Sequence, residues 1–346
     1  MATKTQVQTP QTPMEAYQHQ VHHHCESGAV SNLFTSYGLP LSEEMVFGIG
    51  AGLYFAHVTF LKTMGAPTTT FRFFPGQVFK MAAKTLGVQC TVRTYKDAQK
   101  GMDELDALLA EQKPAGLFTN MLHLAYLPDI FKFEFSAHNV IVYGKEGEDY
   151  LVSDSIIEFP VKISREALAK ARFGKGFLGS KGRMYHVTDF NPKVSLEAAI
   201  RTGIRKMCKR MLSKVYPWGG LRGMRRLAKG IGKYPRKFRE EQVAFYLTNI
   251  VRMQEIVGTG GSGFRLIYAR FLEEAATKLA DPALGLLAEE LRSIATDWRN
   301  FALKAGKTAK AKGGEAMNSG CAQLSAMLAA IADREEQLYL KLLKVI

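Results

Sequence analysis

Cysteine is scarce in this sequence, and the few residues present are not arranged as a cross-link or a metal site. The 346-residue chain has four cysteines. They are far apart and form no CxxC pair, so a disulfide scaffold or a structural zinc site is not expected, and reduced thiols in a cytoplasm fit better. A chain of this length buries roughly 75% of the surface that its unfolded form exposes, so its core needs no disulfide or metal ion for stability. The four are Cys25, Cys90, Cys208 and Cys321.

Long hydrophobic runs are also missing. Residues 1–20 are polar and lack the apolar segment of a secretory leader, so we expect them to form a flexible N-terminal tail. The longest uncharged run, residues 45–61, is interrupted by three glycines and His57, and it falls short of the ~20 apolar residues that a bilayer span requires. We interpret this run as a buried element and expect a cytoplasmic protein.

Acidic residues are nearly absent from one part of the chain. The formal net charge is +14, and the segment from Lys193 to Arg239 accounts for all of it, because Glu197 is its one acid among 15 Lys or Arg. Such a block suits a polyanionic partner, although it is also typical of a solvated helix face. The sequence has no zinc-finger, RNP or KH motif, which argues against nucleic acid. An acidic protein and an anionic membrane surface both stay open.

The two halves of the chain differ in their hydrophobic patterns. Residues 21–190 mix helical spacing with short apolar runs, which predicts an α+β domain. In residues 191–346 apolar residues recur at spacings of three and four, which predicts an all-α domain with an exposed loop at residues 304–314. The expected helices of the first half are residues 25–37, a helix that starts after Ser42, 75–86 and 97–111, and the expected strands are 90–93, 115–119, 138–143, 150–153, 159–163 and 183–187.

Cys25 is the strongest candidate for a catalytic residue. It opens a predicted helix, where backbone N–H groups and the helix dipole stabilise a thiolate. His138 opens a strand from which its ring could reach the cysteine, and Asp154 ends the paired strand and could bind the other ring nitrogen. Cysteine on an early helix, histidine on a later strand and an acid on the next strand is the order of papain-like catalytic sites. The alternative is that Cys25 is a small core residue.

A metal site is not expected beside Cys25. His22, His23 and His24 precede it, but three consecutive side chains cannot converge on one ion. We expect His24 to line the site instead, together with Glu26 and Asn139.

Three stretches of the sequence carry a family resemblance. HHCESGAVSNLFTSYGLPLSEEMVFGIGAGLYF, residues 23–55, resembles the N-terminal domain of the butirosin biosynthesis protein H family. Cys25 with SNLF, followed by HNVIVYGKEGEDYLVSDS at residues 138–155, is more remotely similar to the double-glycine-leader peptidases of bacteriocin export. GTGGSGFRLIYARFLEEAA, residues 258–276, resembles the companion domain of the same family. The resemblance covers most of residues 22–346.

The resemblance implies acyl transfer. The member that names the family moves an aminoacyl chain from an acyl carrier protein thioester to an amine of an aminoglycoside. By this likeness we expect a papain-like catalytic domain and a Cys25 thioester, with His138 as base and Asp154 as the residue that orients it. The expected partners are an acyl carrier protein or acyl-CoA and an amine or alcohol acceptor, in natural-product or lipid biosynthesis. No permanently bound cofactor is expected, since the phosphopantetheine-linked donor is a substrate.

The oxyanion hole departs from the papain-like pattern. The Cys25 N–H would be joined there by an upstream side-chain amide. The position six before the cysteine is His19, however, and Gln20 is the nearby amide that we favour.

Two features of the second half fit a carrier-bound donor. A positive surface would steer the acidic helices of a carrier protein. The glycine-rich run at residues 258–263 precedes a helix, so the N–H groups of Gly260 and Gly261 could hold a pantetheine phosphate, although a simple connection explains the run as well. The candidate cations are Arg222, Arg225, Arg226, Lys229, Arg236 and Lys237.

Two other functions remain open from the sequence. A cysteine peptidase or amidohydrolase would use the same triad with water as acceptor. A non-catalytic protein that binds a polyanion would use the basic block alone, and its binding would weaken steeply with added salt.

Overall fold

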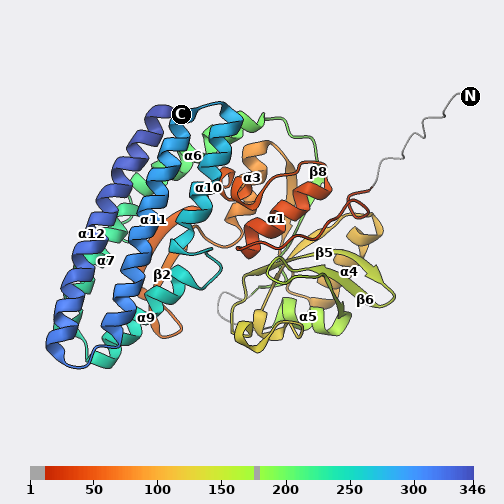
Figure 1. Cartoon of the computed structure of the whole chain (residues 1–346). Coiled ribbons are helices and arrows are strands. Elements are labelled where there is room, and N and C mark those ends of the chain that lie inside the picture. Colours follow the sequence, from red (N-terminus) through yellow and green to blue (C-terminus); the bar gives the residue numbers. More distant parts are fainter. Residues whose placement is uncertain (1–11, 175–179) are drawn as a thin grey trace, which may run out of the picture. The chain divides into compact units, whose positions relative to one another are not determined.

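Two compact units make up the chain in the computed structural model (Figure 1), which describes residues 12–174 and 180–346. The sheet unit comprises Met1–Ser42 and Val88–Asn191, and the helical unit comprises Glu43–Gly87 and Pro192–Ile346. The sequence-based division placed residues 43–87 in the first domain. The contacts group them with the second, because their helices and strands pack on the long helices of that unit.

The sheet unit contains one six-stranded antiparallel sheet with the strand order β3-β8-β4-β5-β6-β7. Helix α1 packs against β5 and β4, and α4 and α5 contact β4. The bounds are α1 (Cys25–Ser36), β3 (Gln89–Arg93), α4 (Ala98–Ala110), β4 (Ala115–Thr119), η1 (Met121–His123), η2 (Asp129–Phe131), β5 (His138–Glu146), β6 (Asp149–Ser153), β7 (Val161–Ser164), α5 (Arg165–Phe173) and β8 (Met184–Asp189).

The sequence patterns of this unit correspond to its elements, so the predicted helices and strands are confirmed. β4 is buried along its whole length, as its unbroken apolar run indicates. Asp97 caps α4, since its side chain accepts a hydrogen bond from the Lys100 N–H. Gly116 in β4 is required by a close approach, because a Cβ there would lie 2.0 Å from the Tyr185 ring. The hairpin of β5 and β6 places the ends of these two strands side by side.

The first 20 residues do not all form a loose tail. Residues 1–11 lie outside the described part of the chain, but residues 12–20 pack onto the sheet unit. Tyr17 is buried and stacks on Tyr143, with ring centroids 4.6 Å apart. Met14 packs against the core, and both ring nitrogens of His19 make hydrogen bonds. The prediction of a flexible tail is therefore wrong for residues 12–20. Their polar composition gave no sign that the rings of Tyr17 and His19 anchor the segment.

The helical unit joins a two-stranded β-hairpin to a bundle of helices. Helix α2 packs on α10 and α6, β1 packs on α7, and β2 packs on α9. The bounds are α2 (Glu43–Ile49), β1 (Leu53–Thr63), β2 (Ala66–Arg72), α3 (Gln77–Leu86), α6 (Leu196–Leu212), α7 (Gly220–Ile231), α8 (Tyr234–Lys237), α9 (Glu240–Glu255), η3 (Ser262–Phe264), α10 (Arg265–Leu279), α11 (Pro282–Ala309) and α12 (Gly314–Val345).

The hairpin of β1 and β2 was not predicted, because its turn lacks the usual residues. Thr63 pairs with Ala66, so the turn has two central residues, Met64 and Gly65. Both have positive φ, 53° and 83°, as a type I′ turn requires. Asn or Asp normally precedes the glycine in such turns, and a methionine gives no turn signal.

A buried ion pair lies in the core of the helical unit. Arg265 Nε and Nη2 donate to the two carboxylate oxygens of Glu335 at 2.8 and 3.0 Å, and both side chains are fully buried. The Trp298 indole and the Tyr339 hydroxyl also donate to this carboxylate, at 2.7 and 2.8 Å. Every oxygen of the buried carboxylate is therefore hydrogen-bonded, which offsets the cost of removing the charges from water.

The two longest helices, α11 and α12, correct one further expectation. α11 continues to Ala309, and α12 begins at Gly314. The loop predicted for residues 304–314 is thus helical over its first half, since alanine and lysine are good helix formers. Neither these helices nor any other in the described ranges has the length and apolar character to cross a membrane.

Candidate active site

Cys25 is the first residue of α1, and the helix begins there because His24 caps it. The His24 Nδ1 accepts hydrogen bonds from the Ser27 N–H at 3.3 Å and from the Ser27 hydroxyl at 2.8 Å. His24 is buried, and Cys25 is 9% exposed. The thiol therefore lies at the positive end of a helix dipole, with limited access to solvent. His24, which the sequence placed as a lining residue, has a capping role.

His138 and Asp154 come together because β5 and β6 form a hairpin. The Nε2 of His138, the first residue of β5, lies 2.7 Å from Oδ2 of Asp154, the residue after β6. His138 is also hydrogen-bonded to Cys25, which leaves its Nδ1 as the nitrogen that faces the thiol. Burial alone would lower the pKa of His138, but the Asp154 carboxylate and then Cys25 outweigh it and raise this pKa from 6.5 to about 10. The geometry favours an imidazolium next to the sulfur.

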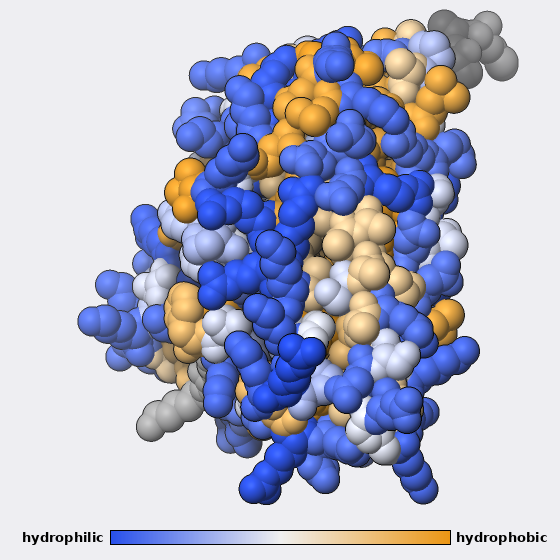
Figure 2. Space-filling model, turned by 90° about the vertical axis from the view of Figure 1, so that its left-hand side faces the viewer, coloured by the Kyte–Doolittle hydropathy of each residue, from blue (hydrophilic) through white to orange (hydrophobic). Residues whose placement is uncertain are grey.

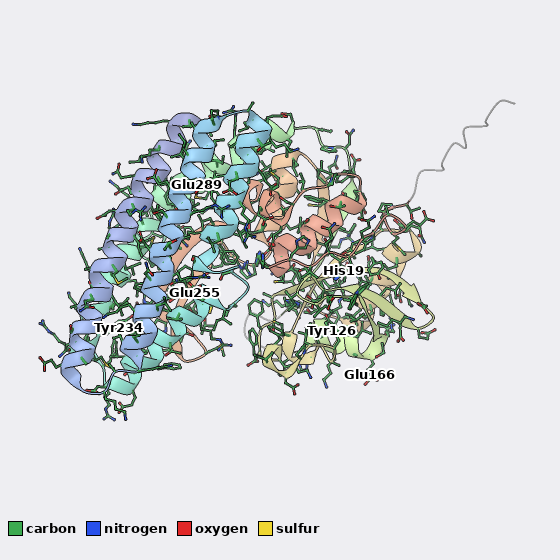
Figure 3. All side chains as sticks on the ribbon, in the orientation of Figure 1. His19, Tyr126, Glu166, Tyr234, Glu255 and Glu289 are labelled. Atoms are coloured by element: carbon green, nitrogen blue, oxygen red, sulfur yellow. The ribbon has the colours of Figure 1, made fainter. Side chains whose placement is uncertain are left out.

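Asp154 is held by two further hydrogen bonds. The Tyr126 hydroxyl donates to its Oδ2 at 3.0 Å, and the Ile156 N–H donates to its Oδ1 at 3.2 Å. Tyr126 belongs to the segment between β4 and β5, and Figure 3 shows its place in the sheet unit. Sequence reasoning missed it, because a tyrosine in an irregular segment carries no periodic signal. These bonds orient the carboxylate toward His138.

A second tyrosine lies close to the candidate nucleophile. Tyr185 on β8 is buried, and burial together with the charges of Glu26 and Cys25 raises its pKa well above its usual value. Glu26 is itself fully buried in the first turn of α1. Asn139 is fully buried beside His138, and its amide N–H donates to the Ala137 carbonyl oxygen. Tyr185 was not predicted, and its ring depends on the space that Gly116 leaves.

The oxyanion donor expected from the sequence gains no support. The Gln20 side chain is exposed, and the Gln20 carbonyl oxygen accepts a hydrogen bond from the Asn32 amide at 3.1 Å. His19 (Figure 3) is bonded through Nδ1 to the Ser153 hydroxyl and through Nε2 to the Ile157 carbonyl oxygen. Because a carbonyl oxygen can only accept, His19 Nε2 carries the proton and donates it to Ile157, so it is not free to donate to an oxyanion. His19 instead anchors the N-terminal segment to the end of β6.

The consecutive histidines have separate partners. His22 Nε2 lies 2.9 Å from the Asn32 side-chain oxygen, and its side chain covers Gly28, where a Cβ would approach it to 2.5 Å. His24 caps α1, and His23 is exposed. In the described ranges of the chain, no three His, Cys, Asp or Glu side chains are grouped as metal ligands.

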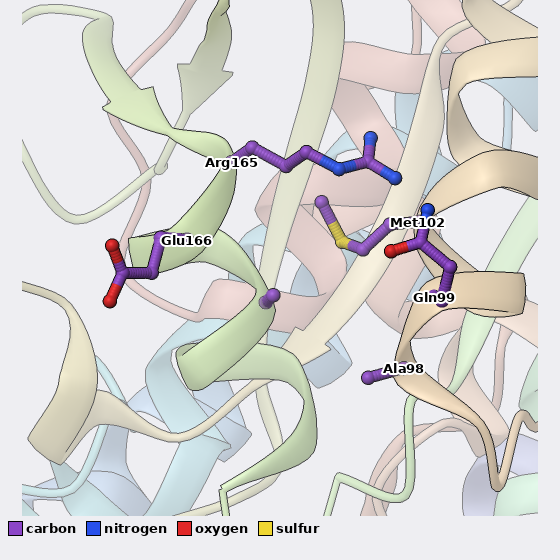
Figure 4. Close-up of a pocket in the computed structure, with 6 residues that line it drawn as sticks. Ala98, Gln99, Met102, Arg165 and Glu166 are labelled. Atoms are coloured by element: carbon purple, nitrogen blue, oxygen red, sulfur yellow. The ribbon is translucent and has the colours of Figure 1, made fainter.

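A hollow of the sheet unit lies away from the candidate triad. It has a volume of about 340 Å³ and lies between α4 and α5 (Figure 4). Arg165 on its rim is bonded to Asp103 and Asp106 at 2.7 and 2.5 Å. The charge of Arg165 is thus already neutralised by two carboxylates, so it gives this hollow no free cation for an anionic ligand. The lining residues are Ala98, Gln99, Met102, Arg165, Glu166 and Ala169.

The glycine-rich run of the helical unit is occupied by an internal carboxylate. Glu255 accepts hydrogen bonds from the Ser262 N–H at 3.2 Å, and the Gly261 N–H donates to the Thr259 hydroxyl at 3.1 Å. A phosphate held by Gly260 and Gly261 would have to compete with this carboxylate. The arrangement supports the other interpretation, a structural connection between α9 and α10.

The basic candidates differ in their surroundings. Arg225 binds Asp333 and Glu336 of α12 at 2.7 and 2.6 Å, so it contributes to packing and not to a polyanion surface. The sequence predicted Arg225 as part of the carrier surface, but the residue is half-buried on α7, where α12 supplies two acids. Arg222 also donates to the Lys214 carbonyl oxygen. The candidates with exposed side chains are Arg222, Arg226, Lys229, Arg236 and Lys237.

The sheet unit, with a helix-terminal cysteine bonded to a histidine that is paired with an aspartate, has the arrangement of papain-like cysteine enzymes. A family model described as butirosin biosynthesis protein H, N-terminal, matches residues 24–155, and a domain of unknown function (DUF4872) matches residues 166–342, half of the chain. The chain therefore belongs to a butirosin biosynthesis protein H-like family, and in this chain the two matched domains follow one another.

Comparisons with individual proteins add little to this assignment. A crystal structure described as that of a C39-like peptidase from Bacillus anthracis is similar over 51% of this chain and 96% of its own, with 14% identity and a TM-score of 0.36. No curated protein matches the sequence.

Proposed function

We propose that the protein is a cysteine-dependent acyltransferase. It would move an acyl or aminoacyl group from a carrier-protein or CoA thioester through Cys25 to an amine or hydroxyl acceptor. The observation that carries the proposal is the hydrogen-bonded series Cys25, His138 and Asp154 at the N-terminus of α1. The family name adds a link to natural-product biosynthesis. The proposed substrate is a thioester and not a peptide, because the thiol of a thioester is a good leaving group.

The first half-reaction exchanges one thioester for another. The Cys25 thiolate attacks the donor carbonyl, and the C–S bond to the pantetheine sulfur breaks. The His138 imidazolium gives its proton to the departing sulfur, so the products are a free pantetheine thiol and an acyl-Cys25 thioester. In this proposal the Cys25 N–H at the start of α1 donates to the oxygen that becomes negative during the attack.

The second half-reaction uses His138 in the opposite sense. The neutral imidazole takes the proton of the acceptor amine or hydroxyl as its nitrogen or oxygen bonds to the acyl carbon. The C–S bond to Cys25 then breaks, which restores the thiolate and imidazolium. Asp154 remains ionised throughout and stabilises the imidazolium each time it forms.

A basic face of α7 would receive an acidic carrier protein. Arg222, Arg226 and Lys229 are spaced by four and three residues, so they lie along one side of this helix and are exposed. Figure 2 shows that hydrophilic side chains predominate on the side of the helical unit that α12 and α7 form. Steering by such a face raises the association rate and weakens with salt.

A hydrolase with the same triad is the second candidate, because water could replace the acceptor in the second half-reaction. The test is to supply acyl-carrier and acyl-CoA donors with a panel of amines and alcohols, and to measure the conjugate and the free acid separately. Conjugate in excess of free acid supports transfer, and free acid at a rate independent of every acceptor contradicts it. Reversal of Arg222, Arg226 and Lys229 to Glu should slow carrier-dependent turnover and remove its salt dependence, whereas an Arg205→Glu control on α6 should not.

A further inference from the structure

The β1–β2 hairpin ends in an exposed apolar tip. Residues 59–65 are all exposed or half-exposed, although the first half of β1 is buried. Phe60 is 80% exposed, Met64 55% and Leu61 43%. Met64 also occupies a left-handed turn position, with φ of 53°, that costs an L-residue other than glycine or asparagine roughly 1 kcal/mol. Three apolar side chains therefore lie in solvent at a turn where polar residues would be less costly.

A phenylalanine of the neighbouring helix extends this apolar surface. The Phe245 ring on α9 is 46% exposed and lies 3.6 Å from the position a Cβ of Gly65 would occupy. About two turns further along α9, Arg252 Nη1 lies 3.5 Å from the Met64 sulfur. We call the side chains of Phe60, Leu61, Met64 and Phe245 the apolar tip.

Basic side chains gather at the same end of the helical unit. The hairpin turn, the connection from α7 through α8 to α9, and the turn between α11 and α12 lie together at the lower end of this unit in Figure 1. Two contacts support this placement, because Gly314 at the start of α12 lies next to Glu240 of α9, and Tyr246 of α9 packs on Phe238. The exposed cations are Lys62, Lys233, Arg236, Lys237, Arg239, Lys307, Lys310 and Lys312, and the exposed acids are Glu240, Glu241 and Glu315.

From this combination we propose that this end of the helical unit binds the surface of an anionic lipid bilayer. The two aromatic rings and two aliphatic side chains of the apolar tip are exposed and can enter the boundary between headgroups and acyl chains. The surrounding cations would then face anionic headgroups, where each contributes about fivefold to the binding constant. A lipid surface suits this combination better than a protein partner, because protein interfaces are depleted of lysine, whereas six of the eight exposed cations at this end are lysines.

This inference is independent of the proposed acyl transfer, because no residue of the candidate triad takes part in it. It reassigns Arg236 and Lys237, which the sequence placed on the carrier surface. They lie on α8, past the end of α7, and so belong by position to the lipid-binding end. The α7 residues Arg222, Arg226 and Lys229 remain the candidates for the carrier protein.

The test is flotation of the full chain with vesicles of pure phosphatidylcholine or of an equimolar mixture of phosphatidylcholine and phosphatidylglycerol. The protein should float with the anionic vesicles at low salt and much less with the neutral ones. Phe60→Ala should weaken binding by about 10- to 100-fold, as expected for loss of a buried aromatic ring. The double variant Arg236→Glu, Lys237→Glu should weaken it by at least about 20-fold, at roughly fivefold for each lost charge.

Matched controls come from the other end of the same unit. Leu286 is 75% exposed near the start of α11, a helix of 28 residues that is about 40 Å long, so it lies far from the tip. Leu286→Ala and the charge reversal Lys278→Glu, at the end of α10, should change vesicle binding by less than twofold. Cys25→Ala should bind vesicles as the wild type does. An unchanged melting temperature will show that each variant is folded.

Three outcomes would overturn the proposal. The first is no flotation with anionic vesicles at low salt. The second is equal loss of binding in Phe60→Ala and Leu286→Ala, which would remove the link to the tip. The third is that Phe60→Ala leaves flotation intact but abolishes self-association or retention on an immobilised acidic carrier protein, in which case the tip serves a second copy or a protein partner.

Discussion

Asp154 holds the imidazole of His138 by its Nε2, at 2.7 Å from Oδ2, and both side chains are almost completely buried. The ring is thereby fixed with its other nitrogen toward Cys25. Because Tyr126 and the Ile156 N–H also bind Asp154, the carboxylate has little freedom to turn away. The pair thus sets both the orientation and the protonation of the histidine on which the proposed transfer depends.

Replacement of Asp154 by asparagine should reduce acyl-enzyme formation by about 10²- to 10⁴-fold, the range typical of a disrupted general acid–base pair. The loss of the carboxylate should also lower the pKa of His138, which stands at about 10 in the native protein. The high-pH limb of the pH–rate profile should consequently move to lower pH. Asp149→Asn, on the same strand β6, serves as the control and should retain the wild-type profile. An unshifted limb in Asp154→Asn would show that this pair does not control the reaction.

Stability should depend on pH through the same histidine. Its pKa is raised in the folded state from 6.5 to about 10, so the folded protein holds a proton that the unfolded chain releases in this range. The stabilisation is complete below about pH 6.5 and is lost as pH rises toward 10, by at most about 1.4 kcal/mol per pH unit. Denaturant unfolding at several pH values should show this decline in the wild type and a weaker one in His138→Gln. If the free energy of unfolding varies with pH in the same way in both proteins, His138 is not the group responsible.

Much of the sheet unit could be predicted from its sequence, because its strands and helices have strong local patterns. The glycine-containing turn between two strand-like runs identified the hairpin of β5 and β6 that brings His138 to Asp154, and the apolar run at residues 115–119 predicted β4. Cys25 was identified by its place at the start of a helix. For these elements the local sequence preferences and the tertiary fold favour the same secondary structure.

Other features could not be predicted because they depend on contacts distant in sequence. Tyr126 and Tyr185 reach the site from an irregular segment and from β8. The hairpin of β1 and β2 has a Met-Gly turn without a local signal, and its grouping with the helical unit depends on α7 and α9. In the sequence Arg225 cannot be distinguished from the other cations of α7, because its two acidic partners belong to α12, about 110 residues further along the chain.

Tyr126 should act as a positioning residue. Tyr126→Phe removes the hydroxyl that donates to Asp154 Oδ2 but keeps the ring, so we expect a decrease of about 10- to 100-fold in the rate of acylation, in line with one hydrogen bond to a charged group. The pH–rate profile should shift as well, which a merely structural defect would not cause. Tyr143→Phe is a suitable control, since this ring stacks on Tyr17. Unchanged acylation and an unchanged profile would remove Tyr126 from the site.

The buried ion pair of the helical unit should be costly to break. Glu335→Ala leaves Arg265 charged and buried without its partner, so we expect a loss of about 3–5 kcal/mol in the free energy of unfolding. The double variant Arg265→Leu, Glu335→Leu should lose less, because neither charge remains in the core. Denaturant titration with the exposed pair Lys341 and Glu290 as a reference would measure both effects. A double variant as unstable as Glu335→Ala would argue against this explanation.

The most direct test of the account is intact-mass spectrometry of the protein after incubation with acyl-carrier and acyl-CoA thioesters, with Cys25→Ala measured in parallel. The account predicts a mass increase equal to one acyl group in the wild type alone, removed by hydroxylamine. The absence of an adduct with every donor, together with a Cys25 that does not react with iodoacetamide at neutral pH, would contradict the proposed acyl-enzyme.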